Sequence, residues 1–307
     1  MNWCRNEESL MMRVLKKVGL NGFSWSMRRL HCPVSESALV LEVGSGGNPY
    51  FRSNVLLDAY EETRERHWAP LVSDRPTVLG FVEHLPFRDK VFDFVIASHV
   101  LEHSQNPEKF LSELQRVAKA GYIEVPDAFM ERINPYRDHR LEITVRDGRL
   151  LIRKKKDWLV DSELVALYED RVKRILTSRT MRENPYEFHV RYYWSDSIDF
   201  DVLNPLEDAG WAAPESEVGM SSCASGGMRQ KFGQWVLKRI RSSCSQNKRN
   251  AELSLDGLLA CPVCGSIEIA RGEDSLKCEQ CSSIYPIKNG VPVMYPVAGA
   301  HDSLVAK

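Results

Sequence analysis

The sequence lacks any apolar run that approaches the roughly 20 residues needed to span a bilayer. It also lacks an excess of charge, because 41 lysines and arginines oppose 42 acids and leave a net charge of −1. Overall charge therefore favours neither a nucleic acid nor a membrane as partner. The amino terminus carries Arg5, Glu7 and Glu8 before its apolar residues, which differs from a signal peptide. We expect a soluble, cytoplasmic protein.

Cysteines available for disulfides are few. Four of the eight lie close together near the end of the chain, and the other four are scattered: Cys4, Cys32, Cys223 and Cys244. This distribution argues against a disulfide framework and for a reducing compartment. With 307 residues and 43% apolar side chains, the chain can form one large and one small domain.

A glycine turn follows the first strand-like run. The apolar run 38–43 leads into Gly-Ser-Gly-Gly at 44–47, and a second run, 55–57, ends in Asp58. Such runs are typical of buried parallel strands. Glycines there let a ligand approach the backbone, and an acid one strand later is suited to bind the hydroxyls of a ribose. The pattern favours a nucleoside site, although the same glycines also occur in ordinary tight turns.

The same stretch lacks the features of a phosphate site. The dinucleotide fingerprint needs a third glycine that opens a helix. Here Asn48 and Pro49 follow instead, and only seven residues separate Gly47 from the next strand. A helix of ordinary length does not fit there, and the lysine of a P-loop is absent. We therefore expect a ligand without phosphates.

Strands and helices alternate through the next part of the chain. Apolar runs at 77–82, 91–97 and 121–126 predict further strands, and 107–119 has apolar residues at helical spacing behind a proline. This alternation predicts an α/β fold with a doubly wound, Rossmann-like sheet that binds ligands at its carboxyl edge.

Three flanking segments complete this part of the chain. Residues 7–18 have apolar side chains at helical spacing and predict a helix that packs on the core. Residues 21–37 look irregular, and the charged run 60–67 predicts a solvated helix.

These motifs resemble class I S-adenosylmethionine-dependent methyltransferases of the type 11 kind. The resemblance covers residues 38–126 and includes the segments VEHLPFRDKVFDFVIASHVLEH and PEKFLSELQRV. It implies S-adenosylmethionine as cofactor, with the methionine part above the glycine turn, the ribose on the acid and the adenine near the end of the 77–82 run. The cofactor residues that it implies are Glu42, Gly44, Ser45, Gly46, Gly47, Asp58, Val82, Glu83, Ser98 and His99.

One position departs from the family pattern. The family usually has a polar residue, often Asp, just before the position of Val82, and this chain has Phe81. The resemblance then implies that stacking and backbone groups hold the adenine.

Residues 127–200 are predicted to be an insertion into that minimal fold. Asp147-Gly148 between two strand-like runs predicts a hairpin, and Asp161 is suited to cap a helix. We expect this region to form the acceptor pocket. The candidates for orienting or deprotonating an acceptor hydroxyl are His139, His189, Arg191 and Tyr192. Packing of the histidines and aromatic residues against the sheet is the alternative interpretation.

The carboxyl-terminal module carries two Cys-x-x-Cys motifs separated by thirteen residues: Cys261, Cys264, Cys278 and Cys281. Four thiolates complete a tetrahedral Zn²⁺ site without a position for water, so we expect a structural role. A redox role for one motif is the alternative, and the paired second motif disfavours it.

The residues around these cysteines resemble a second family. Over 255–296, and most closely at 285–294, they resemble the small zinc-ribbon activator subunits that pair with tRNA and translation-factor methyltransferases. In that family the small protein covers an apolar edge of its catalytic partner. We hypothesise that this chain carries its activator module in cis.

The predicted domains are a methyltransferase domain at 1–240, a linker at 241–254 and a zinc ribbon at 255–299. Residues 228–250 contain seven lysines or arginines and no acids, with apolar residues at helical spacing. A helix followed by a solvated linker is the favoured interpretation. Peripheral membrane contact through 228–241 and RNA binding are the alternatives.

The sequence thus predicts methyl transfer from S-adenosylmethionine. The sulfonium already activates the methyl group, so the protein mainly has to align the reactants, which fits the absence of a visible nucleophile. We favour a small molecule or a glycan as acceptor. The alternatives are RNA or a translation protein, and a noncatalytic scaffold with a degenerate methyltransferase fold.

Overall fold

The computed structural model describes residues 7–63, 70–168, 172–212, 239 and 245–296. Its helices are α1 (Leu10–Lys17), α2 (Asn21–Met27), α3 (Pro107–Val117), α4 (Ala128–Ile133), α5 (Ser162–Tyr168), α6 (Val172–Ile175), α7 (Met181–Glu183) and α9 (Asn247–Glu252). Its strands are β1 (Val40–Val43), β2 (Val55–Asp58), β3 (Thr77–Leu79), β4 (Phe94–Ser98), β5 (Ala120–Pro126), β6 (Leu141–Arg146), β7 (Arg149–Lys154), β8 (His189–Ser195), β9 (Phe200–Val202), β10 (Ile269–Arg271), β11 (Ser275–Cys278), β12 (Ile284–Lys288) and β13 (Val291–Pro292).

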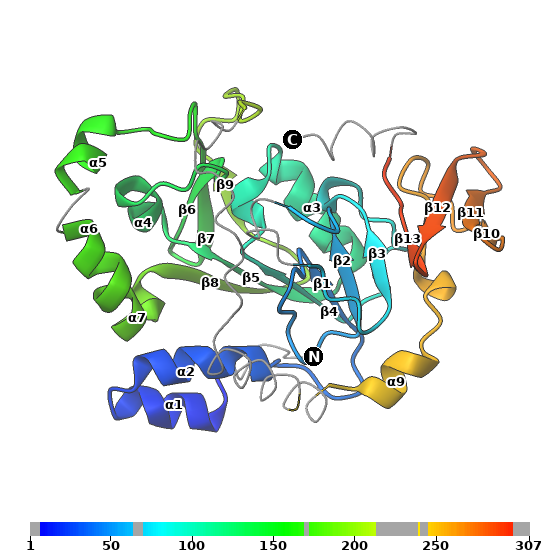
Figure 1. Ribbon diagram of the computed structural model, residues 1–307, viewed down its shortest axis with the longest axis horizontal. Coiled ribbons are helices and arrows are strands. Elements are labelled where there is room, and N and C mark those ends of the chain that lie inside the picture. The colour runs from blue at the N-terminus through cyan, green and yellow to red at the C-terminus, as the bar shows by residue number, and fades with distance from the viewer. Residues whose placement is uncertain (1–6, 64–69, 169–171, 213–238, 240–244, 297–307) are drawn as a thin grey trace.

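A six-stranded sheet forms the centre of the molecule, in the order β3-β2-β1-β4-β5-β8 (Figure 1). The first five strands are parallel and β8 runs antiparallel to β5. This arrangement confirms the predicted doubly wound, Rossmann-like sheet. In the register, Val43 lies beside both Leu57 and Ala97, so the carboxyl ends of β1, β2 and β4 meet at one edge.

The crossover helix α3 forms where its sequence pattern predicts. Asn106 caps it by accepting a hydrogen bond from the backbone N–H of Lys109 at 2.9 Å, and Pro107 occupies the first turn. Its apolar residues are buried against the sheet: Phe110, Leu111, Leu114 and Val117. The helix ends at Val117, two residues before the predicted end.

The amino-terminal segment differs from expectation after its first helix. The helix predicted over 7–18 is present as α1, but most of its apolar side chains are exposed and only Met12 is buried. The irregular structure expected for 21–37 is wrong at its start, where α2 forms. Its Ser24 hydroxyl bonds to the Met12 carbonyl at 2.9 Å and lies 2.7 Å from the Tyr186 hydroxyl. These partners are remote in sequence, so local periodicity does not reveal them.

The inserted region forms a three-stranded sheet of β6, β7 and β9 with four short helices beside it (Figure 1). The hairpin at Asp147-Gly148 is confirmed, with both residues at the positive φ values that this two-residue turn needs. Asp161 caps α5 through the backbone N–H of Leu164 at 2.8 Å. Strand β8 lies within the segment assigned to the insertion, yet it is a strand of the main sheet.

The carboxyl-terminal module is a four-stranded antiparallel sheet, β10-β11-β12-β13, which lies beside β3 (Figure 1). Val293 bridges Leu79 in parallel, and the Met294 N–H donates to the Leu79 carbonyl at 2.7 Å. On the other side Leu259 bridges Phe87. The side chains of Met294, Leu259 and Phe87 are all fully buried in one core with the main sheet.

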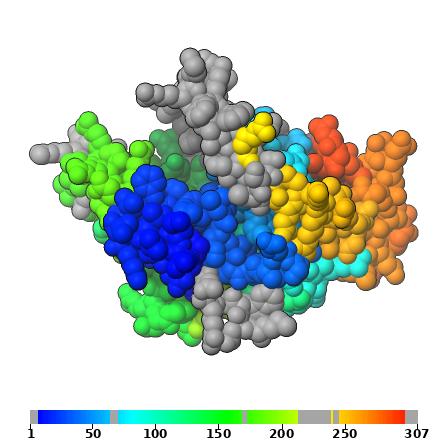
Figure 2. Space-filling model, turned by 90° about the horizontal axis from the view of Figure 1, so that it is seen from below, coloured from blue at the N-terminus to red at the C-terminus, as the bar shows by residue number. Residues whose placement is uncertain are grey.

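Helix α9 fills part of the segment predicted as a linker. Its Arg249 donates to the backbone carbonyls of Glu36, Ser37 and Ala38, and Asn54 bonds to the Asn250 side chain at 2.8 Å. Figure 2 accordingly shows α9 against the amino-terminal part of the chain. Nearly all of the basic segment 228–241 lies outside the described residues, as does the second half of the charged run 60–67. The described half, 60–63, forms no part of the helix predicted there. Among the helices of the described part, none is long and apolar enough to cross a bilayer.

Gly121 in β5 gives a direct test of the packing between β5 and β8. A Cβ at this position would lie 2.6 Å from Nε1 of Trp194, which is buried on β8. We predict that Gly121→Ala lowers the free energy of unfolding by about 1–3 kcal/mol, because the indole and the strand must shift to relieve the overlap.

Urea unfolding of the full chain measures this difference. Gly257→Ala is the matched control, because a Cβ there meets nothing within 4 Å. Equal stability of the two variants would contradict the close packing at Gly121.

Candidate functional site

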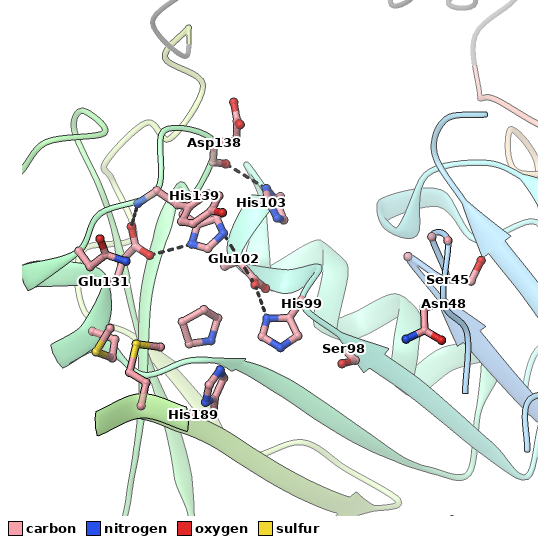
Figure 3. A pocket seen from close by; sticks show the side chains of 18 of the residues that line it. Ser45, Asn48, Ser98, His99, Glu102, His103, Glu131, Asp138, His139 and His189 are labelled. Atoms are coloured by element: carbon pink, nitrogen blue, oxygen red, sulfur yellow. Dashed lines mark hydrogen bonds and ion pairs between the residues drawn. The ribbon is translucent and has the colours of Figure 1, made fainter. Parts of the chain in front are cut away.

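A cavity of about 470 Å³ lies at the carboxyl edge of the main sheet. One wall is the glycine turn after β1, and the other is formed by α4, the loop that follows it and the start of β8 (Figure 3). The volume falls in the range of small-molecule pockets. The cavity therefore joins the predicted cofactor turn to the predicted acceptor region.

The glycine turn is held close to β4 and β2. Gly44 and Gly46 have φ values of +64° and +57°, and a Cβ on Gly44 would lie 2.6 Å from a Val100 methyl carbon. The Gly46 N–H donates to the Asp58 carboxylate at 2.8 Å. The turn thus requires glycine for its conformation and for its packing.

Two polar side chains beside the turn suit a ligand with polar groups. Ser45 is 4% exposed, and its hydroxyl has no hydrogen-bond partner among the described residues although it lines the cavity. Buried hydroxyls normally have a partner. Arg29 also lines the cavity and donates to the Asn48 carbonyl at the end of the turn.

Glu42 lies beneath the turn at the end of β1. Its carboxylate accepts hydrogen bonds from the Tyr50 N–H at 2.8 Å and from the Ser53 hydroxyl. Burial raises the pKa of Glu42 to about 7, and these bonds and the nearby Arg29 only partly oppose that rise.

Most of the predicted cofactor residues line this cavity: Glu42, Gly44, Ser45, Gly46, Gly47, Ser98 and His99. Three do not belong to its described lining. Asp58 accepts from Gly46 and from the Tyr60 N–H at 3.1 Å, Val82 is buried, and Glu83 accepts from the Ser104 hydroxyl at 2.6 Å. A carboxylate can accept about four hydrogen bonds, so holding the turn and binding a ribose are compatible roles for Asp58.

His99 follows β4 in a left-handed conformation with a φ of +57°. Its ring nitrogens lie 3.4 Å from the Glu102 carboxylate and 3.1 Å from the Glu124 carboxylate. Burial alone would lower the pKa of His99, but the two carboxylates outweigh it and raise the pKa to about 9. His99 is therefore charged at neutral pH.

Two further histidines come together on the acceptor side of the cavity. The rings of His103 and His139 are in edge contact, with centroids 4.7 Å apart. His139 Nδ1 lies 2.7 Å from the Glu131 carboxylate (Figure 3). Glu131 also accepts a hydrogen bond from Lys155 at 2.7 Å. Of the predicted catalytic candidates, His139 thus lines the cavity and is oriented by a buried acid.

His189 also lines the cavity, beside His99, with the ring centroids 5.5 Å apart (Figure 3). Its Nδ1 lies 2.9 Å from the Pro185 carbonyl, which places the proton on Nδ1 and the lone pair on Nε2. Burial lowers the pKa of His189, and the nearby charge of His99 acts in the same direction. His189 is therefore neutral at neutral pH.

The remaining two candidates lie further along β8, outside the described lining of the cavity. Arg191 bonds to the Tyr122 hydroxyl and to Glu8, both at 3.2 Å. Tyr192 is buried on the opposite face of the strand, and its hydroxyl accepts from the Asp199 N–H at 3.1 Å.

Five residues of the site were not singled out from the sequence: Arg29, Glu102, His103, Glu124 and Glu131. A signal existed for two of them. Glu124 stands inside the apolar run 121–126, and Glu102 follows a buried strand closely. An acid in such a position is buried and needs a partner, and this makes it a candidate for a site.

The four cysteines of the carboxyl-terminal module form a second cluster. Their sulfur atoms lie within 4.8 Å of one another, with Cys261 and Cys281 3.5 Å apart and Cys264 and Cys278 3.6 Å apart. Sulfurs bound to one Zn²⁺ at about 2.3 Å in tetrahedral geometry are separated by similar distances. The donor set and spacing fit zinc.

Comparison with known proteins follows the same division of the chain. Residues 41–123 match a family model described as a methyltransferase domain. A curated relative, an uncharacterized protein of Methanocaldococcus jannaschii, is 49% identical over 39 residues, which are 13% of this chain and 19% of that protein. The chain thus spans about a fifth of the length of this relative.

Solved structures give weak overall similarity. A complex between the Haloferax volcanii Trm112 methyltransferase activator and a methyltransferase is 16% identical, covers 61% of this chain and 94% of that chain, and has a TM-score of 0.36. An S-adenosylmethionine-dependent methyltransferase from Archaeoglobus fulgidus is 17% identical, covers 45% of this chain and 69% of that chain, and has a TM-score of 0.29. One from Mesorhizobium loti is 10% identical, covers 56% of this chain and 96% of that chain, and has a TM-score of 0.32.

The family match therefore falls on the strands, the glycine turn and the crossover helix that build the cavity wall. Residues 41–123 of the chain thus match a methyltransferase domain and lie within a doubly wound, Rossmann-like sheet.

Proposed function

We propose that the chain methylates a hydroxyl group of a small molecule or glycan that binds in the 470 Å³ cavity, with the carboxyl-terminal module acting in cis as its stabiliser. One observation carries this proposal: a single cavity connects the glycine turn to a wall of histidines and carboxylates. S-adenosylmethionine, when bound, supplies a methyl group that its sulfonium has already activated. The residues that line the cavity then bind the cofactor, orient the acceptor and remove the proton from its hydroxyl group.

The cofactor half of the cavity suits a phosphate-free nucleoside with an amino-acid tail. We assign Ser45 and the backbone of the turn to its polar groups, Arg29 to the carboxylate and Glu42 to the ammonium group. Asp58 remains the proposed ribose ligand at the other end of the turn, next to Gly46. The unsatisfied Ser45 hydroxyl supports this assignment most directly.

The acceptor half favours a neutral, hydroxyl-bearing molecule over RNA. Its described lining contains the acids Glu102, Glu131 and Asp138 and no lysine or arginine, since Lys155, which pairs with Glu131 at 2.7 Å, does not line the cavity. Phosphate groups gain affinity from lysine and arginine and are repelled by carboxylates. Hydroxyl groups of a glycan or small metabolite can instead hydrogen-bond to these acids.

We assign proton removal from the acceptor hydroxyl to His189. It is neutral, and the lone pair on Nε2 can accept a proton because Nδ1 is engaged with Pro185. His99 is unsuited to this role, because its raised pKa keeps it protonated. Its positive charge instead stabilises negative charge that develops on the acceptor oxygen.

The in-cis role of the carboxyl-terminal module is supported by its contacts with β3. That strand has three residues, and without the module it would present an open edge of the main sheet. The ring of Tyr295 packs on Phe81 at 4.9 Å, and its hydroxyl donates to the Ala59 carbonyl, next to Asp58. The module thus borders the region proposed for ribose and adenine. Zn²⁺ in the cysteine cluster would serve its folding.

The proposed function predicts micromolar binding of S-adenosylmethionine and of its demethylated product. Glu42 makes this binding depend on pH. Its pKa is raised to about 7, so its carboxyl group is mostly protonated in the free protein below that pH. The cofactor ammonium favours the carboxylate, so binding should tighten by up to about tenfold from about pH 6 to about pH 8, with proton release. Calorimetry measures both quantities.

Glu42→Gln is the control for this titration, since its affinity should not change with pH over the same interval. A noncatalytic scaffold would bind neither compound. A wild-type protein that binds neither at any pH would therefore refute the methyltransferase reading of the cavity.

The assignment of His189 predicts that His189→Asn lowers kcat by about 10²–10⁴-fold, the usual contribution of a general base. The affinity for S-adenosylhomocysteine, the demethylated product, should stay within about twofold of the wild-type value, because the substitution does not touch the cofactor half of the cavity. Steady-state kinetics and calorimetry separate the two effects.

His84→Asn is the matched control, because His84 is exposed and lies outside the described lining of the cavity. Unchanged kcat in His189→Asn would assign proton removal to another group. A return of the lost activity at higher pH is the secondary signature of a missing base.

The in-cis hypothesis predicts that deletion of 250–307 leaves an insoluble or cofactor-blind enzyme. Tyr295→Ala tests it without removing the module. This variant should stay folded and bind S-adenosylhomocysteine about 2–10-fold more weakly, because an aromatic contact contributes roughly 0.5–1.5 kcal/mol. Calorimetry and thermal unfolding measure affinity and folding.

Ile284→Ala, at an exposed position of the same module, is the control and should bind normally. Full cofactor affinity in both the truncated chain and Tyr295→Ala would refute the in-cis role.

A further inference from the structure

We propose that Glu102, His103 and His139 bind one divalent transition-metal ion on the acceptor side of the cavity. This inference deepens the proposed function, because the ion would bind the acceptor hydroxyl, but the site itself can be tested without an acceptor. It is separate from the cysteine cluster of the carboxyl-terminal module.

The three side chains converge on one point. One ligand atom from each lies within 4.8 Å of those from the other two, and His139 Nε2 is 4.0 Å from a Glu102 oxygen. Metal–nitrogen and metal–oxygen bonds are about 2.0–2.2 Å long, so two ligands of one ion lie up to about 4 Å apart. Side-chain shifts of less than about 1 Å therefore bring all three into coordination distance.

Both imidazoles are already oriented as metal ligands usually are. His139 Nδ1 is 2.7 Å from the Glu131 carboxylate, and His103 Nδ1 is 3.1 Å from the Asp138 carbonyl. Each contact places the ring proton on Nδ1 and the lone pair on Nε2. A carboxylate or a backbone carbonyl that accepts the Nδ1–H of a metal-binding histidine fixes the orientation of its ring and raises its basicity.

The acid of the cluster is buried and has only distant cationic partners. Glu102 is 2% exposed, and its carboxylate lies 3.4 Å from the charged His99 ring and 4.0 Å from His139 Nε2. These separations are longer than those of a good hydrogen bond. A bound cation would add direct ligand bonds to this buried carboxylate.

The ligands come from two parts of the fold. Glu102 and His103 lie on the turn Leu101–His103 after β4, and His139 lies on the loop after α4. A hydrogen bond of 2.7 Å from the Arg140 N–H to the Glu102 carbonyl already joins them. All three side chains line the cavity, so an ion there would have coordination positions facing the acceptor.

Two imidazoles and one carboxylate indicate the class of metal. This set suits manganese, iron, cobalt, nickel or zinc as divalent ions, whereas magnesium and calcium prefer oxygen ligands alone. Such an ion lowers the pKa of a coordinated hydroxyl, as it does for water. The acceptor O–H bond would then break more readily, with its proton passing to His189.

Cobalt is the probe for the test, because Co²⁺ bound by nitrogen and oxygen gives weak visible bands without the intense thiolate charge-transfer band. Full-length protein with its cysteine cluster loaded with zinc is titrated with Co²⁺. We expect one ion per chain with the weak bands. His103→Asn and His139→Asn should lose at least about tenfold in affinity, and Glu131→Gln about tenfold through its loss of support for His139.

His189→Asn and His84→Asn are the controls, one lining the cavity outside the cluster and one remote from it, and both should bind Co²⁺ as the wild type does. Equal Co²⁺ affinity in His103→Asn, His139→Asn and the wild type would overturn the proposal, as would spectra with thiolate bands only. Glu102→Gln provides a further variant if one histidine variant fails to fold.

Calorimetry with S-adenosylhomocysteine keeps this proposal apart from the proposed function. If the wild-type protein binds Co²⁺ at the cluster but does not bind S-adenosylhomocysteine, the metal-site proposal stands and the proposed methyltransferase function is refuted. If it binds S-adenosylhomocysteine but not Co²⁺, the proposed function stands and the metal-site proposal is refuted.

Discussion

The buried carboxylate of Glu124 holds the functional edge of this protein together. It lies fully buried in β5 and receives two hydrogen bonds from the Arg28 guanidinium, at 2.6 and 2.9 Å, one from the Tyr122 hydroxyl at 2.5 Å and one from His99 at 3.1 Å. Taking a charge out of water costs several kcal/mol unless its partners are well placed. These donors come from the amino-terminal segment, β4 and β5, so the cost is offset only when all three are assembled.

The same carboxylate sets the protonation of the cavity. By holding His99 beside Glu102, it keeps one imidazole charged, and that charge disfavours protonation of His189 across the cavity. One histidine is thereby cationic and another neutral at the same pH, although their free pKa values are equal. In the proposed function, this separation would give a single pocket both a positive charge for a developing oxyanion and a base for its proton.

Sequence patterns revealed the parts of the site that are local. The glycine turn, the alternation of strands and a crossover helix, and the paired Cys-x-x-Cys motifs each follow from residues close together in the chain, and all are present in the structure. Helix α2 and the acids Glu102 and Glu124 were missed, because their partners are remote. Glu124 meets Arg28 across 96 positions, and Glu102 approaches His139 across 37. Such pairs depend on the fold and have no periodicity to read.

On the proposed in-cis role, the contact between β3 and the carboxyl-terminal module gives a physical reason for the two parts to occur in one chain. β3 is short and would be an exposed edge, and Val293 and Met294 cover it through Leu79. Both residues are buried, and Met294 belongs to the same core as the main sheet. A separate subunit would have to be present at a concentration above its dissociation constant to keep this edge covered. A tether replaces that requirement by an effective concentration that reaches the millimolar range for a short linker. Helix α9 shortens the tether further. Its Arg249 bonds to the Ala38 carbonyl just before β1, and its Asn250 bonds to Asn54 just before β2, so the start of the module is fixed against the main sheet.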